Sequence, residues 1–412
     1  MDIRQQKGLA IANKATIKKD GNLYLVPSQS GRGKYKVDAD AKHCTCPDFD
    51  FRQAKCKHIY AVEHTIEQTE KTKTTVTANG KTTTTETVKV TRQTYRQEWP
   101  AYNKAQMNEK RLFLYLLHQL CQGVGSPAQH GAGQRRMSLE DMIFAMAFKV
   151  YSTVSGRRFM TDLRDAQGKG YLSQAPSYNV IFDYFQSEML TPYLQMLIEE
   201  SSLPLAAIEK DFAVDSSGLS TCRFVQWISA KYTDSQLLEA KDWIKVHLMC
   251  GVKTNVVTAV EITDRYAGDS PHFKPLVEAT AKNFYMMQEV SADKAYLSSA
   301  NLKVVQDAHA MPYIAFRANS NASGRRQSEL WKRMYHYYSH NQEWFMQHYH
   351  KRSNVETTFH MIKSKFGDAL RSKTKRAQIN EALCKILCHN ICCLIQSMYE
   401  LNLKPKFWSV AA

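Results

Sequence analysis

Apolar residues recur at helical spacing near the C-terminal end of the chain. Val355, Phe359, Ile362 and Phe366 are separated by four, three and four positions, which is the spacing of a helix face that packs against a core. This pattern predicts a helix across residues 349–365 with one buried side. The polar positions of the same stretch then follow another side of that helix.

Four of these polar residues form a stripe beside the apolar face. Tyr349, Arg352, Glu356 and Lys363 stand at offsets of zero, three, seven and fourteen residues. At roughly 100° per residue, these offsets return to within about 60° of one another. A carboxylate and two cations therefore line the edge of a core. A helix whose solvated side is merely charged gives the same pattern, so the spacing alone leaves both interpretations open.

The pattern upstream of this helix is typical of strands. Short apolar runs predict strands at residues 210–217, 242–252, 255–263, 287–296 and 312–318, and helical spacing predicts helices at 271–283 and 299–310. Asp215 closes the first run, and Asp293 closes the fourth. The order of three strands, helix, strand, helix, strand and helix predicts an α/β domain, a mixed sheet flanked by helices, at residues 205–412.

Residues 101–204 have helical spacing and predict an all-helical domain. Ser138 and Asp141 are placed as a capping box at the start of one helix. Further on, a turn leads into a helix whose first residues, Ser177, Tyr178 and Asn179, are polar. A helix-turn-helix unit presents side chains to DNA in this way, and core packing explains the pattern about as well. These three residues are therefore candidate DNA contacts.

Four potential zinc ligands lie close together near the N-terminus. Cys44, Cys46, Cys56 and His58 form the pattern C-x-C-x9-C-x-H, between predicted strands at residues 22–28 and 33–39 and a predicted helix at 57–68. Two such pairs joined by a short loop can wrap a tetrahedral Zn²⁺, and the alternative is a chance cluster of unligated residues. Because four protein ligands leave no open position, the predicted zinc is structural.

A threonine-rich segment follows at residues 69–94. Threonine and valine favour strands, and Asn79-Gly80 in its middle is a strong hairpin signal. A two-stranded ribbon is therefore favoured slightly over a flexible linker. The sequence predicts a zinc module at residues 1–65, this ribbon or linker at 66–100, a helical DNA-binding domain at 101–204 and the α/β domain at 205–412.

Composition narrows the choice of partner. Lys and Arg number 55 against 39 Asp and Glu, a net charge of +16 in 412 residues, which favours a polyanion such as nucleic acid. Ten cysteines without an apolar signal at the N-terminus indicate free thiols and metal ligands rather than disulfides. Among them, Cys384, Cys388 and Cys392 recur every four residues on an apolar helix and are interpreted as core residues. No apolar run approaches the roughly 18 residues needed to cross a bilayer, so we expect a cytoplasmic protein with no membrane partner.

Two motifs resemble known families. The spacing of Tyr349, Arg352, Glu356 and Lys363 matches the Y-(2)-R-(3)-E-(6)-K signature of DDE transposases of the bacterial insertion-sequence type. Residues 205–403 resemble the ribonuclease H-like core of that group. Residues 20–65, with their C-x-C and C-x-H pairs, resemble the SWIM-type zinc finger, and this second resemblance implies binding to DNA or protein.

The transposase resemblance implies a catalytic trio of Asp215, Asp293 and Glu356. Cleavage of a DNA phosphodiester needs an activated water and charge relief on the leaving oxygen, which two Mg²⁺ (or Mn²⁺) ions held by carboxylates supply. We expect Asp215 to bridge both ions, and Asp293 and Glu356 to hold one each. The resemblance also implies that Tyr349, Arg352 and Lys363 contact the DNA phosphates near the cut.

The expected function is therefore that of a transposase, an endonuclease and strand transferase that acts in DNA transposition and recombination. It binds the ends of its mobile element, cleaves them, and joins the 3′-hydroxyl ends to target DNA. Its expected partners are double-stranded DNA and, when two ends are brought together, further copies of itself, in a nucleoid-associated complex. The alternative is a transposase-derived, zinc-dependent DNA-binding protein without cleavage activity, and an intact acid trio favours the enzyme.

Overall fold

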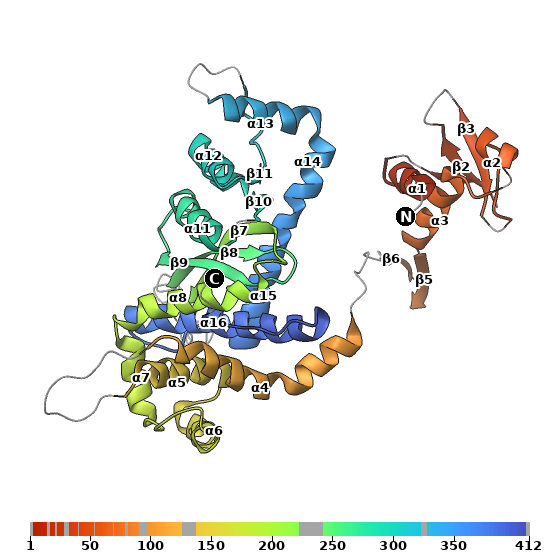
Figure 1. Cartoon of the computed structure of the whole chain (residues 1–412). Helices are drawn as coiled ribbons and strands as arrows, with labels where there is room; N and C mark the ends of the chain where they lie inside the picture. Colours follow the sequence, from red (N-terminus) through yellow and green to blue (C-terminus); the bar gives the residue numbers. More distant parts are fainter. Residues whose placement is uncertain are drawn as a thin grey trace, which may run out of the picture. The chain divides into compact units, whose positions relative to one another are not determined.

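The computed structural model describes residues 3–14, 17–20, 23–28, 33–39, 41–52, 54–68, 70–78, 81–89, 98–125, 137–221, 242–284, 286–322 and 328–408. The chain forms two compact units, Met1–Gln97 and Glu98–Ala412 (Figure 1). Each unit is described by itself.

Unit 1, Met1–Gln97, contains a small antiparallel sheet packed against helices. Its elements are α1 (Ile3–Lys14), β1 (Lys18–Asp20), β2 (Leu23–Pro27), β3 (Lys34–Asp38), β4 (His43–Cys44), α2 (Pro47–Arg52) and α3 (Lys57–Gln68), with the strands paired in the order β1-β2-β3-β4. Val26, Val37 and Ile59 are fully buried between the sheet and α3. The strands predicted at 22–28 and 33–39 and the helix at 57–68 are confirmed.

The threonine-rich segment contains β5 (Glu70–Ala78) and β6 (Lys81–Lys89). The two strands pair antiparallel along their whole length, from Glu70 opposite Lys89 to Ala78 opposite Lys81. The predicted Asn79-Gly80 turn lies outside the described residues.

Unit 2, Glu98–Ala412, begins with helices. These are α4 (Trp99–Gln122), α5 (Leu139–Ser152), α6 (Gly156–Gly168), α7 (Tyr178–Gln186) and α8 (Leu190–Ser202), followed by the 3₁₀ turn η1 (Leu203–Leu205). Serine hydroxyls cap three of them, because Ser138, Ser155 and Ser177 each accept a backbone N–H from the first turn. The reciprocal half of the predicted capping box is absent, since the Asp141 carboxylate accepts from the backbone N–H of Ser173 instead.

The α/β part of unit 2 has the expected order of elements. They are β7 (Asp211–Ser220), β8 (Trp243–Gly251), β9 (Val257–Asp264), α11 (Ser270–Asn283), β10 (Glu289–Ala292), η2 (Lys294–Tyr296), α12 (Ser299–Asp307), β11 (Met311–Ile314), α13 (Glu329–His340), α14 (Gln342–Tyr349), η3 (His350–Arg352), α15 (Ser353–Phe366) and α16 (Lys375–Glu400). The sheet order is β11-β10-β7-β8-β9, with β10 parallel to β7 and β11, and β8 antiparallel to β7 and β9. The α/β class and the ribonuclease H-like mixed sheet flanked by helices are confirmed.

Alternation along β7 divides the core between the two faces of this sheet. Phe212 and Val214 pack with α11, α12, α13 and α14, whereas Ala213 and Leu219 pack with α15, α16 and the helices α4 to α8 (Figure 1). The helical region and the face of the sheet under α15 therefore share one core.

Helix α16 is the only helix of the described residues that is long and apolar enough to span a membrane by length and composition. That corrects the expectation that no segment meets this criterion. Its most apolar window is 78% buried inside the protein, and Cys384 and Cys388 are completely buried in it. The predicted core role is confirmed for these two thiols, whereas Cys392 is only partly buried and packs against the same core.

Two local predictions were wrong. Residues 349–365 do not form one α-helix, because α14 ends at Tyr349 and the 3₁₀ turn η3 precedes α15. Asp215 does not close its strand, because β7 pairs with β8 as far as Ser220 opposite Trp243. The apolar face of α15 is as predicted, with Val355, Phe359, Ile362 and Phe366 all buried.

Candidate active site

Three elements bring Asp215, Asp293 and Glu356 to one edge of the sheet. Asp215 lies in β7, and Asp293 follows β10 directly. Since Ala292 is the parallel partner of Val214, the next residues of the two strands, Asp293 and Asp215, lie beside each other. Asp215 shares its face of β7 with Ala213, the face that α15 covers, and Glu356 is in the first turn of α15.

Arg352 joins two of these carboxylates. Its Nη1 donates to Asp215 Oδ2 at 2.9 Å, and its Nη2 donates to Glu356 Oε1 at 2.6 Å. The side chains of Arg352 and Asp215 are 23% and 22% exposed, whereas that of Glu356 is 58% exposed. The site is therefore partly buried at Asp215 and open to solvent at Glu356.

The trio concentrates negative charge. Burial raises the pKa of Asp215, and the neighbouring Asp293 and Glu356 raise it further, despite the backbone N–H of Ser216 and the guanidinium of Arg352, which lower it. The one cation that pairs with the trio among the described residues, Arg352, is shared between Asp215 and Glu356. Carboxylate oxygens are the ligands that Mg²⁺ and Mn²⁺ prefer, so the residues present fit divalent cations.

The other residues of the signature contact this edge as well. Tyr349 Oη donates to Asp293 Oδ1 at 3.3 Å. Lys363 Nζ donates to Ser217 Oγ at 2.7 Å, and burial lowers the pKa of Lys363. Ser217 shares its face of β7 with Asp215 by strand alternation. All four signature residues thus lie along β7 and the end of β10.

Lys351, which the sequence did not single out, fastens η3 to the sheet. Its Nζ donates to Asp211 on β7 and to Glu289 on β10, both at 2.7 Å. His348 Nδ1 is 2.7 Å from the other oxygen of Glu289. These contacts of Lys351 and His348 hold the turn that carries Arg352. The only sequence signal for Lys351 is its position next to the signature residue Arg352.

A second network lies on the opposite face of β7 from Glu356. Asp269 precedes α11, but its side chain makes no capping bond. Instead Asp269 accepts from Ser216 Oγ at 2.6 Å and is 2.7 Å from Lys245 Nζ. Ser216 in turn gives its backbone N–H to Asp215 Oδ1 at 2.8 Å. The Asp269 carboxylate therefore supports the strand beside Asp215 rather than the first turn of α11.

The candidate DNA contacts on α7 lie apart from the trio. Ser177 and Asn179 are exposed, and Tyr178 is partly buried. The Ser177 hydroxyl caps α7, and the Tyr178 ring lies 5.4 Å from the guanidinium of Arg157. Their exposure is compatible with DNA contact, and no bond between them and the trio is found in the described residues.

The four predicted zinc ligands of unit 1 come together. The ligand atoms of Cys44, Cys46, Cys56 and His58 all lie within 4.8 Å of one another, and all four residues are buried. His58 Nδ1 is 3.8 Å from Cys44 Sγ and 3.9 Å from Cys56 Sγ. A tetrahedral zinc with bonds of about 2.0 to 2.3 Å holds nitrogen and sulfur ligands roughly 3.5 Å apart, so this set fits zinc.

The thiols of this cluster are also electrostatically suited to a cation. The hydrogen bond from Cys44 lowers the pKa of Cys56, whereas the pKa of Cys44 rises for the same reason. The backbone N–H of Phe49 donates to Cys46 Sγ at 3.4 Å. One thiolate is thus already favoured in the cluster, as a metal site requires.

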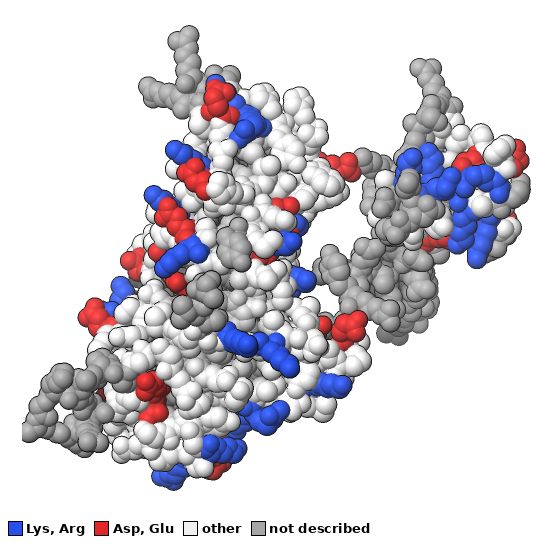
Figure 2. Space-filling view, in the orientation of Figure 1, with Lys and Arg blue, Asp and Glu red and all other residues white. Residues whose placement is uncertain are grey.

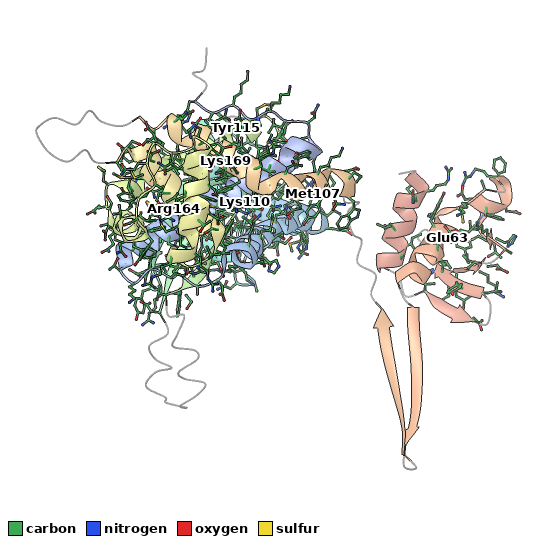
Figure 3. All side chains as sticks on the ribbon, turned by 90° about the horizontal axis from the view of Figure 1, so that it is seen from below. Glu63, Met107, Lys110, Tyr115, Arg164 and Lys169 are labelled. Carbon is green, nitrogen blue, oxygen red and sulfur yellow. The ribbon has the colours of Figure 1, made fainter. Side chains whose placement is uncertain are left out.

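Basic residues gather on the helical region of unit 2. Figure 2 shows Lys and Arg side chains over its lower right part, with few acidic ones among them. Figure 3 labels Lys110 of α4, Arg164 of α6 and Lys169 on the face of unit 2 that is seen from below. The ion pair of Lys110 with Asp162, at 2.9 Å, joins the two helices. This surface is positively charged, as a DNA-facing surface would be.

Comparison with known proteins agrees with both motifs. Residues 207–391 match the family model of the transposase DDE domain, and residues 35–67 match that of the SWIM zinc finger. No curated protein and no solved structure matches the chain. The first matched stretch contains the trio and the rest of the signature, and the second contains the four zinc ligands, so both resemblances are confirmed.

Proposed function

We propose that this chain, which carries a transposase DDE domain and an N-terminal SWIM zinc finger, is a transposase that binds the ends of its mobile element, cleaves them and joins them to target DNA. A DDE domain implies a divalent metal and DNA as a partner, and a SWIM finger implies zinc. The observation that carries the proposal is the meeting of Asp215, Asp293 and Glu356 at one sheet edge, with Arg352 between two of them.

In the proposed reaction, water first attacks the phosphorus at the element end, and the bond to the 3′ oxygen breaks to leave a 3′-hydroxyl. That hydroxyl then attacks a phosphorus of the target and displaces a target 3′ oxygen. Asp215 would bridge two Mg²⁺ or Mn²⁺ ions, with one each at Asp293 and Glu356. When bound, such ions supply charge relief on the leaving oxygen and acidify the attacking water.

The chain's own residues hold this arrangement in place. β7 and β10 fix the two aspartates by their shared register, and Lys351 fastens the turn before α15. The edge of the sheet that holds the trio also has two cations, Arg352 and Lys363, and a hydroxyl hydrogen-bond donor, Tyr349. In the DNA complex we assign them to the phosphates beside the cut.

The remaining parts would bind and place the DNA. We assign zinc at Cys44, Cys46, Cys56 and His58 to the folding of the N-terminal module, residues 1–65, which acts in targeting. We assign DNA contact to Ser177, Tyr178 and Asn179 within the helical region, residues 101–204, where basic residues gather. The DDE chemistry is assigned to residues 205–412. Because two ends must be joined together, we expect a homo-oligomer on the nucleoid, in the cytoplasm.

The direct experiment incubates the purified chain with labelled duplexes that carry the ends flanking its gene. In Mg²⁺, nicks at the element ends followed by joined products are expected, and duplexes with scrambled ends serve as the control. Specific binding of the ends with no nick and no joined product in either Mg²⁺ or Mn²⁺ would contradict the proposal. That result would favour a DNA-binding protein without cleavage activity.

A further inference from the structure

A cavity of about 420 Å³ lies where α5, α7 and the start of α16 meet (Figure 1). Its size falls in the range of roughly 300 to 1,000 Å³ that is typical of small-molecule sites. Phenylalanines and basic residues line it together, among them Lys149, Phe182, Phe366, Arg371 and Lys373. None of the trio lines this cavity.

Two cations converge on one carbonyl oxygen in its wall. Lys149 Nζ donates to the carbonyl of Val154 at 2.7 Å, and Arg371 Nη1 donates to the same oxygen at 3.1 Å. Lys149 is only 7% exposed and makes no ion pair with the described residues. Burial and the charge of Arg371 together lower the pKa of Lys149 to about 8. A buried cation beside a like charge is costly unless an anion joins it.

The described residues of this wall carry more positive than negative charge. Glu381 partly compensates Lys149 and raises its pKa, but Arg371 and Lys373 line the cavity as well. Glu381 is the one carboxylate among the lining residues. Its two oxygens accept the backbone N–H of Arg371, each at 3.0 Å, and one also accepts that of Ser372 at 2.8 Å. Thr374 and Ala377 bring the N-terminus of α16, a 26-residue helix, to the same wall. The positive end of its dipole adds to the two cations.

Aromatic residues form an apolar wall of the cavity. Phe182 is 44% exposed on α7. Its ring lies so close to Gly156 that a Cβ there would approach within 2.8 Å. The absence of a side chain at Gly156 therefore lets the ring lie against the start of α6. Phe185 and Phe366 also line the cavity and are buried. The cavity thus combines a flat apolar wall with one that carries a net positive charge.

We propose that this cavity binds a nucleotide, with the phosphate at Lys149 and Arg371 and the base against Phe182. A phosphate supplies negative charge to a wall in which cations outnumber the one carboxylate, and every base offers a face for aromatic stacking. A free nucleotide and one nucleotide of a single DNA strand both provide such a phosphate and base. The proposal concerns residues outside the trio and does not rest on the function proposed above.

Acylation of Lys149 in the full chain tests this directly. The full chain is treated at about pH 8 with an amine-selective reagent, and mass spectrometry of the peptides measures the extent of Lys149 modification. Deoxyadenosine monophosphate is expected to protect Lys149 at concentrations at which inorganic phosphate or deoxyadenosine alone does not. No protection, or equal protection by phosphate alone, would overturn the proposal. Stronger protection by a single-stranded oligonucleotide identifies the DNA strand as the source, and weaker protection identifies the free nucleotide.

Phe182→Ala keeps the basic wall and removes an exposed ring, so the chain should still fold. It is expected to raise the protecting concentration of the nucleotide by about tenfold, the effect of one lost stacking contact. Tyr266→Ala removes another exposed ring, 79% exposed and outside the cavity, and should leave protection unchanged. Equal effects of the two substitutions, with both proteins folded, would contradict a base bound against Phe182.

Discussion

The guanidinium of Arg352 donates to the carboxylate of Asp215 at 2.9 Å, although 137 residues separate them in the chain. The same guanidinium reaches Glu356 one helical turn away. Arg352 thus connects the strand that carries one acid of the trio with the helix that carries another. The signature places Arg352 and Glu356 four residues apart, and the packing of α15 on β7 brings both of them close to Asp215.

Asp269 is expected to act as a positioning residue for Asp215. Asp269→Asn removes the charge that pairs with Lys245 and weakens the acceptor for Ser216, whose backbone N–H is bonded to Asp215. Support of this kind behind metal-binding residues is worth about 10- to 100-fold in affinity or activity. We expect nicking to fall by that order and to need more Mg²⁺.

Asp264→Asn is the matched control for this change. Asp264 is exposed at the end of β9, and its carboxylate accepts from the backbone N–H of Tyr266. Nicking should be unchanged in this variant at every Mg²⁺ concentration. If the two variants have the same Mg²⁺ dependence, Asp269 has no positioning role.

Loss of one zinc ligand should empty the site of unit 1. Cys56→Ser is expected to release one equivalent of zinc and to unfold the module, because a closed tetrahedral site depends on every thiolate. Metal analysis and circular dichroism measure both effects. Cys392→Ser, a partly buried thiol outside the cluster, should retain the zinc. Unchanged zinc content in Cys56→Ser would refute the assignment.

The buried His389 should make the stability of unit 2 depend on pH. Burial lowers its pKa from 6.5 to about 4, and its Nε2 is 2.9 Å from the carbonyl of Asn255. The neutral, buried His389 stabilises the folded state fully at pH values above 6.5, its pKa in the unfolded chain. This stabilisation is lost as the pH falls toward about 4, its pKa in the folded chain, because the unfolded chain binds the proton first. Between neutral pH and about pH 5, the free energy of unfolding should fall by about 2 kcal/mol through this residue.

His389→Gln keeps a donor for Asn255 and removes the titration. Urea unfolding at several pH values should therefore show a pH dependence reduced by about that amount. The exposed His360 on α15, changed to Gln, should leave the dependence as it is. A slope that is equal in the parent chain and in His389→Gln would show that His389 does not titrate in this range.

Much of the fold and of the site could be predicted from the sequence. Apolar runs predict the strands of the sheet, and the predicted order of these strands with α11 and α12 along the chain is confirmed. The four zinc ligands are close in the chain, so their spacing already implied a cluster, which the structure brings within 4.8 Å. Arg352 and Glu356 are four residues apart, and that local spacing was visible as well.

The features that were missed depend on contacts between distant parts of the chain. The support that Asp269 gives to the strand beside Asp215 was not predicted, because its partner Ser216 is 53 residues away. Asp215 looked like a strand end, because only the pairing with β8 extends β7 to Ser220. The cavity at Lys149 arises where α5, α7 and α16 pack together, and none of these helices shows it alone. Periodicity reports local structure, whereas such partners are set by the tertiary fold.

The central claim is tested most directly by Asp293→Asn, which keeps the size of the side chain and removes its charge. End binding by gel shift, thermal stability, and nicking in Mg²⁺ and Mn²⁺ are measured on one preparation. We expect nicking and strand joining to fall by several orders of magnitude, while binding persists, because DNA affinity comes mainly from Lys and Arg at phosphates. Near-normal nicking by the folded variant would remove Asp293 from the trio and contradict the account.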